Sequence, residues 1–94
     1  MPLVISANVR DKLSKKEPPV TVREIEQCME NRQGGLLVDT RLKNRTDPPT
    51  LWFIAETNQS RKLKIVYIQD GADVIVKSAY DPNPEERRIY AKYC

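Results

Sequence analysis

The sequence predicts a single α+β domain over residues 1–94, with two N-terminal helices, a four-stranded antiparallel sheet and a C-terminal helix. Two observations predict this class. Apolar residues recur at helical spacing in the first third of the chain and then alternate with a period of two. The links between the alternating segments are short, as between antiparallel neighbours. We therefore expect helices on one face of the sheet and solvent on the other.

The two N-terminal helices are expected at residues 7–16 and 22–31. In the first, apolar residues recur every four positions, and a Glu-Pro-Pro run then stops the helix. In the second, Thr21 and Glu24 are spaced as a capping box, in which each side chain bonds the backbone of the other. The glycines at 34–35 are expected to end this helix in a left-handed turn.

Alternating apolar residues predict the four strands, and an Asp-Gly pair at 70–71 predicts a tight turn before the last one. On the third strand, Lys62 and Lys64 share one face, and Lys77 is expected beside them across the hairpin. We expect these lysines to be solvated on the open face. The strands are expected at residues 36–41, 50–57, 62–68 and 74–80.

A final helix is expected at residues 84–92, with Asn83 as its N-cap and a proline in its first position. Tyr90 and Tyr93 have spacings that suit packing on the sheet. Trp52, on the second strand, is expected in the core rather than as an exposed platform for a base.

Composition excludes several classes of protein. Apolar residues make up 39% of the chain, and no run of them approaches the roughly 20 needed to span a bilayer. We expect a cytoplasmic protein with no membrane contact. Histidine is absent and the two cysteines are far apart in sequence, so neither a metal site nor a cofactor is expected. The net charge is +3, and residues 36–69 carry six basic and three acidic side chains, which permits a polyanionic partner.

Several short motifs occur in one order along the chain. They are Asp39-Thr40-Arg41, then Arg45, Leu63-Lys64-Ile65-Val66-Tyr67, Ser78-Ala79-Tyr80 and Glu86-Arg87-Arg88-Ile89-Tyr90. Together these motifs resemble the BrnT family of bacterial toxins, which is similar in fold to RelE, and the resemblance covers about residues 7–93.

The resemblance implies a metal-independent endoribonuclease that blocks translation and pairs with a cognate antitoxin protein. Such cleavage needs cations at the phosphate and groups that exchange protons with the 2′-hydroxyl and the leaving oxygen. Tyr80 and Glu86 are the expected catalytic residues. The expected RNA and phosphate contacts are Arg41, Arg45, Lys64, Lys77 and Arg87.

The chain departs from the family pattern in two places. Glu17-Pro18-Pro19-Val20 stands where the family has a His-Gly-Val motif, and Tyr80 stands where it has an arginine. An inactive relative therefore stays open beside the nuclease, and so does a non-catalytic protein-interaction module. The RNA preference and the oligomeric state also stay open.

Chains with a similar second strand, Pro-Pro-Thr-Leu-Trp-Phe-Ile-Ala-Glu-Thr, are also described as hydrolases that remove ADP-ribose from dinitrogen reductase. Enzymes with that activity are much larger helical proteins with a carboxylate-bound pair of metal ions. The 13 acidic residues here are scattered along the chain, several of them at helix starts, and do not make up such a site.

Overall fold

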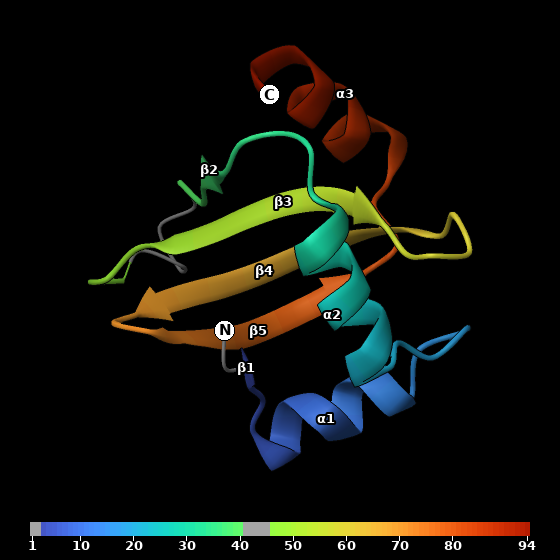
Figure 1. The fold of residues 1–94 in the computed structure, drawn as a ribbon, viewed down its shortest axis with the longest axis vertical. Coiled ribbons are helices and arrows are strands. Elements are labelled where there is room, and N and C mark those ends of the chain that lie inside the picture. Colours follow the sequence, from blue (N-terminus) through green and yellow to red (C-terminus); the bar gives the residue numbers. More distant parts are fainter. Residues whose placement is uncertain (1–2, 41–45) are drawn as a thin grey trace.

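The computed structural model describes residues 3–40 and 46–94 and confirms the α+β class. Three helices accompany one sheet of five strands, in the order β1-β5-β4-β3-β2 (Figure 1). The elements are β1 (Leu3–Val4), α1 (Ala7–Ser14), α2 (Val22–Asn31), β2 (Leu37–Val38), β3 (Thr50–Glu56), β4 (Lys62–Asp70), β5 (Asp73–Tyr80) and α3 (Pro84–Tyr93).

The sheet differs from the predicted four-stranded antiparallel one. The strands β2 to β5 are antiparallel neighbours, but β1 adds a fifth strand that runs parallel to β5, with Leu3 opposite Val74. The sheet is therefore mixed. A strand of two residues is too short to show a period of two, which is why β1 was not expected. The first predicted strand, residues 36–41, shortens to the two residues of β2.

The two N-terminal helices lie close to their predicted bounds. Helix α1 ends at Ser14, two residues early, and α2 spans the predicted 22–31. The capping box is present: the Glu24 N–H donates to the Thr21 hydroxyl oxygen at 3.1 Å, and the Thr21 N–H donates to Glu24 Oε1 at 3.0 Å. Local sequence therefore sets the start of α2.

The expected left-handed glycine turn after α2 is wrong. The cap residue, Arg32, has an extended backbone, with φ −59° and ψ 125°, and neither glycine that follows has a positive φ. Gly34 instead permits a close approach, because a Cβ there would lie 2.7 Å from the Tyr90 hydroxyl. Gly71 does adopt a left-handed φ of 59°, as the predicted turn between β4 and β5 requires.

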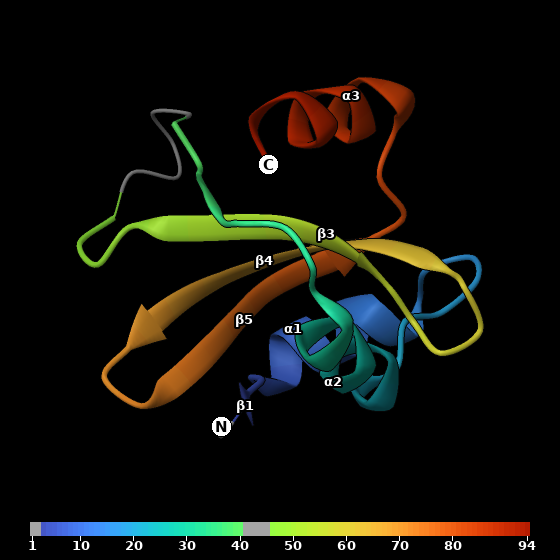
Figure 2. The same cartoon turned by 45° about the horizontal axis from the view of Figure 1, so that its top comes forward.

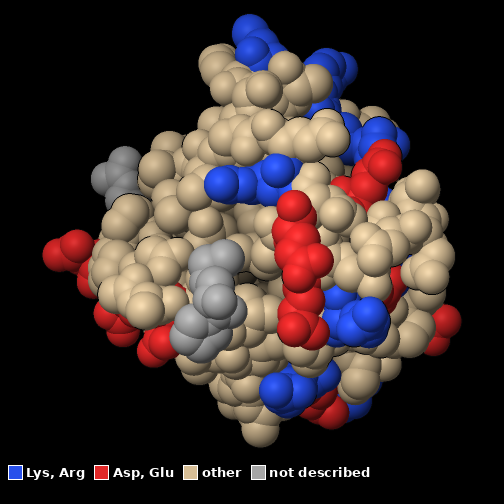
Figure 3. All heavy atoms as spheres, in the orientation of Figure 1, with Lys and Arg blue, Asp and Glu red and all other residues tan. Residues whose placement is uncertain are grey.

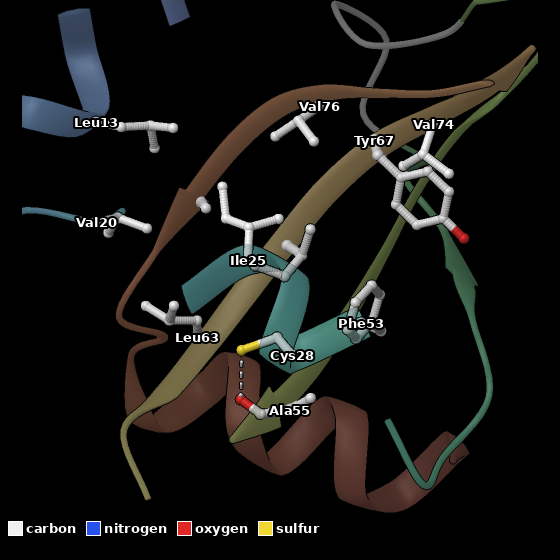
Figure 4. Packing of buried hydrophobic residues seen from close by; sticks show 12 residues of the cluster. Leu13, Val20, Ile25, Cys28, Phe53, Ala55, Leu63, Tyr67, Val74 and Val76 are labelled. Atoms are coloured by element: carbon white, nitrogen blue, oxygen red, sulfur yellow. Dashed lines mark hydrogen bonds between the residues drawn. The ribbon is translucent and has the colours of Figure 1, made fainter. Parts of the chain in front are cut away.

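Helices α1 and α2 cover one face of the sheet and close an apolar core (Figure 4). Burial here is complete for Ile25, Cys28 and Phe53, each 0% exposed. The Cys28 thiol donates to the Ala55 carbonyl oxygen at 3.6 Å, and burial raises its pKa to about 11. Both Cys28 and Cys94 are free thiols.

Helix α3 lies on the opposite face of the sheet from α1 and α2 (Figure 2), so the expected open face is partly covered. Under it, Trp52 is 8% exposed, which confirms its core placement, and the rings of Trp52 and Tyr90 lie 5.8 Å apart. Tyr93 is 65% exposed, so its expected packing on the sheet is wrong. The structure thus has three layers: two helices, the sheet and one helix.

Candidate functional site

Three of the predicted site residues meet beneath α3. Lys64 on β4 and Tyr80 at the end of β5 are direct partners in the sheet. Glu86, in the first turn of α3, reaches both. Its Oε2 lies 2.6 Å from Lys64 Nζ and accepts a hydrogen bond of 2.8 Å from the Tyr80 hydroxyl. We call these three residues the Glu86 cluster.

A capping box at the start of α3 holds Glu86 in place. The Asn83 side chain accepts from the Glu86 N–H at 2.7 Å, and Glu86 Oε1 accepts from the Asn83 N–H at 3.0 Å. This is the N-cap that the sequence predicts. Both carboxylate oxygens of Glu86 are therefore engaged, one by the helix backbone and the other by Lys64 and Tyr80.

Lys64 is buried, so the prediction that it lies solvated on an open face is wrong. Only 6% of the residue is exposed, and its Nζ lies 4.4 Å from the centroid of the Trp52 ring. The aromatic ring and the Glu86 carboxylate together offset the cost of burying the ammonium group. Lys16, which follows α1, places its Nζ 5.4 Å from the centroid of the Tyr80 ring.

The cluster fixes the protonation of its members. Burial works against ionisation of the Glu86 carboxyl, but hydrogen bonds from Lys64, the Asn83 backbone and Tyr80 outweigh it, so the pKa of Glu86 lies below its ordinary value of 4.5. Burial also raises the pKa of Tyr80 above its ordinary value of 10.0. At neutral pH the cluster therefore holds a carboxylate and a protonated phenol.

The other predicted phosphate contacts are not gathered around this cluster. Lys77 is exposed and has no direct partner, because it falls at a register shift of the β4–β5 pair. Lys64 pairs with Tyr80 instead, so Lys77 does not lie beside it across the hairpin as expected. Arg87 is exposed on α3. Arg41 and Arg45 lie outside the described residues. On the face seen in Figure 3, cations and carboxylates are interspersed rather than collected in one basic patch.

Two cavities lie beside α3, and Lys62 and Arg87 line both of them. The larger, of about 710 Å³, is formed by the end of α2 and the segment after it, the end of β3, and one side of α3. The smaller, of about 420 Å³, is formed by the turn before β4 and the link between β5 and α3. Among the described side chains, Lys62 and Arg87 form no ion pair.

Sequence reasoning did not single out Lys62 as a binding residue separate from Lys64. The alternation of β4 places the two lysines on one face, but only Lys62, at the start of the strand, stays exposed. The signal that separates them is position, because Lys62 is the first residue of β4 and pairs with the last residue of β3, Glu56, whereas Lys64 lies further inside the sheet.

Arg61 is a second residue that sequence reasoning missed. Its guanidinium donates to the carbonyl oxygens of Pro18 and Pro19, at 3.0 and 2.8 Å, and lies 3.1 Å from Glu24 and 2.7 Å from Asp81. It thereby ties the start of β4 to the turn before α2 and to the link before α3. Its charge is neutralised by these two carboxylates, so Arg61 is an anchor of the smaller cavity rather than a free cation.

Within residues 3–40 and 46–94, no group of three or more histidine, cysteine or acidic side chains is placed to hold a metal ion. In the same part of the chain, none of the helices has the length and apolar character needed to cross a membrane. Comparisons with protein-family models, curated proteins and solved structures give no match to this chain.

Proposed function

We propose that this chain is an RNA-directed domain of the RelE/BrnT-like toxin type that binds RNA without cutting it. The observation that supports binding is the pair Lys62 and Arg87, two exposed cations that line both cavities and form no ion pair within the described residues. Phosphates suit such cations, since a guanidinium bonds a phosphate through two N–H groups and an ammonium acts as a point charge.

The Glu86 cluster supports a non-cleaving domain. A base that takes the 2′-hydroxyl proton needs a free lone pair and a pKa near the working pH. Glu86 has a lowered pKa, and three of the roughly four acceptor sites of its carboxylate are already taken by Lys64, Tyr80 and the Asn83 N–H. Tyr80 is committed to Glu86 as a donor. The predicted catalytic pair thus holds α3 against the sheet, and of the nuclease and its inactive relative we propose the inactive relative.

Three further predicted contacts remain part of the proposal: Lys77, which is exposed and lines neither cavity, and Arg41 and Arg45, which lie outside the described residues. Each carries a positive charge that would neutralise a further backbone phosphate. Binding of this kind weakens steeply as salt rises, because each phosphate contact releases condensed counterions.

Binding of fluorescein-labelled RNA to the purified chain, followed by anisotropy at several salt concentrations, tests this proposal. We expect Arg87→Ala to weaken binding about tenfold, in line with the loss of a charge-assisted hydrogen bond. Arg88→Ala is the matched control, since Arg88 is the neighbouring exposed arginine and lines neither cavity. Absence of RNA binding at low salt would overturn the proposal.

Cleavage is measured separately, by incubating RNA with the chain in the presence of a chelator. We expect the RNA to stay intact and expression of the chain to leave bacterial growth unchanged. If expression arrests growth, and if the chain cleaves RNA in a way that Glu86→Gln abolishes, the non-cleaving part of the proposal is overturned. The nuclease hypothesis would then be favoured.

A protein-interaction module is the second candidate, and exposed apolar side chains favour it. Val38 on β2 is 52% exposed, and Ile89 and Tyr93 on α3 are 39% and 65% exposed. Side chains of this kind occur at protein contacts, where a cognate antitoxin would bind. This candidate is favoured if the chain binds no RNA but forms a stable complex with a protein, and if Ile89→Asp and Tyr93→Asp each disrupt that complex.

A further inference from the structure

Lys62 and Arg87 line both cavities, so the two cavities are neighbours with a cationic border, and we call the pair the groove. We propose that this groove holds two successive nucleotides of a single strand, with the phosphate that joins them between Lys62 and Arg87. This inference rests on the proposed function and names the form of RNA that the site accepts.

The shape of the groove selects single strands. Hollows of about 710 and 420 Å³ lie within the range of cavities that enclose small ligands. A base enters such a hollow only when it is unpaired and splayed from its neighbours, because paired bases stay stacked inside the duplex. A duplex can lie against Lys62 and Arg87 but cannot fill either cavity.

The larger cavity carries the features of a base site. Tyr90 lines it and is held in place, because its hydroxyl donates to the Gly35 carbonyl oxygen at 2.7 Å and its ring packs 5.8 Å from Trp52. A fixed aromatic side chain is a suitable wall for a base. Gly34 gives the segment after α2 the room to pass this ring.

Two carboxylates in the larger cavity are acceptors for the edge of a base. Glu30 and Glu56 line the cavity and form no ion pair among the residues described. Arg32 lines the same cavity and Glu56 is the cross-strand partner of Lys62, so the cavity is not closed to a phosphate by charge. The two carboxylates do accept hydrogen bonds, and amino groups on a base edge are suitable donors. Adenine, cytosine and guanine carry such a group and uracil does not. We therefore expect a preference for adenine over uracil.

The first experiment compares fluorescein-labelled A8 and U8 RNA with an RNA duplex, by anisotropy at several salt concentrations. We expect A8 to bind at least fivefold more tightly than U8 and the duplex to bind more weakly than both. Glu30→Ala should abolish the difference between A8 and U8 while leaving U8 binding unchanged or stronger. Equal binding of A8 and the duplex would overturn the proposal.

The second experiment counts phosphates. If Lys62 and Arg87 hold one phosphate, Lys62→Ala with Arg87→Ala should lower the slope of log affinity against log salt by about 0.7, the value for one contact on a single strand. Two separate phosphates would lower it by about 1.4 and would overturn the shared-phosphate geometry. Arg88→Ala is the control and should leave the slope unchanged.

These outcomes separate the two proposals. If A8 and U8 both fail to bind at low salt, the proposed RNA function itself fails. If they bind and the Lys62 and Arg87 variants change neither affinity nor slope, RNA binds elsewhere on the chain. The groove proposal and the assignment of Lys62 and Arg87 then fail, while RNA binding itself stands.

Discussion

The two faces of the sheet are held by different kinds of contact. On the face covered by α1 and α2, apolar side chains such as Ile25 and Phe53 are fully buried. On the face covered by α3, the helix has no buried residue of its own and is held mainly by the Glu86 cluster and the Tyr90 hydroxyl, with one ring contact between Tyr90 and Trp52. Apolar burial therefore carries the fold, whereas polar contacts orient α3 and leave room for the two cavities beside it.

The first way to test this contrast is to remove apolar volume from the first face. Phe53→Ala should lower the free energy of unfolding by about 3–5 kcal/mol, the usual cost of deleting a buried aromatic ring. Tyr93→Ala, an exposed aromatic residue on α3, should change it by less than about 0.5 kcal/mol. Urea unfolding measures both. Similar losses for the two variants would contradict the contrast between the faces.

The second test breaks the Glu86 cluster on one side or the other. Glu86→Ala leaves the Lys64 ammonium buried without its carboxylate and should cost about 3 kcal/mol. Lys64→Met keeps the volume and leaves Glu86 bonded to Tyr80 and Asn83, so it should cost about 1 kcal/mol or less. Urea midpoints of the two variants give the asymmetry. A greater loss for Lys64→Met would show that the carboxylate, not the ammonium, is the costly group to leave unpaired.

The third test loosens only the C-terminal end of α3. Gly34→Ala places a Cβ 2.7 Å from the Tyr90 hydroxyl, which must move and lose its bond to Gly35, at a cost of about 1 kcal/mol. We expect faster hydrogen exchange at the last amides of α3 and none of that change in α2. Gly35→Ala is the control, because the nearest atom to its Cβ would be Cys94 Sγ at 3.7 Å. Equal effects of the two substitutions would exclude the Tyr90 contact as the cause.

The smallest effect is a pH dependence. Because the pKa of Glu86 is lower in the folded chain than its ordinary value of 4.5, its ionisation contributes stability that is present above about pH 4.5 and is lost as the pH falls through the folded pKa. Glu86→Gln should remove this part of the acid destabilisation. The measurement is urea unfolding of both chains between pH 7 and pH 3. Parallel pH profiles would mean that Glu86 does not have a lowered pKa.

Local signals predicted much of the fold. The Thr21 capping box sets the start of α2, Gly71 sets the turn between β4 and β5, and the Asn83 cap sets the start of α3. These features depend on residues within a few positions of each other, so the sequence shows them directly. The edge strand β1 was missed because its pairing with β5 joins residues far apart in the chain.

The placement of α3 was not predicted, although the sequence contains a signal for it. Trp52 and Val66 are apolar residues on the face of the sheet that was expected to be open, and the two are direct partners. Apolar residues on both faces of central strands indicate cover on both sides. The burial of Lys64 had no local signal, since its partner Glu86 lies 22 residues away and lysine is usually exposed.

The hydrogen bonds from α2 to β3 affect whether the sheet can pair with a strand of another molecule. The Cys28 thiol and the Asn31 amide both donate to carbonyl oxygens near the end of β3, those of Ala55 and Glu56. A strand from a second molecule that approached the end of β3 would have to displace the Asn31 amide before it could pair with Glu56. The outermost strands, β1 and β2, have only two residues each and offer little backbone for such pairing. These features disfavour the formation of an intermolecular sheet.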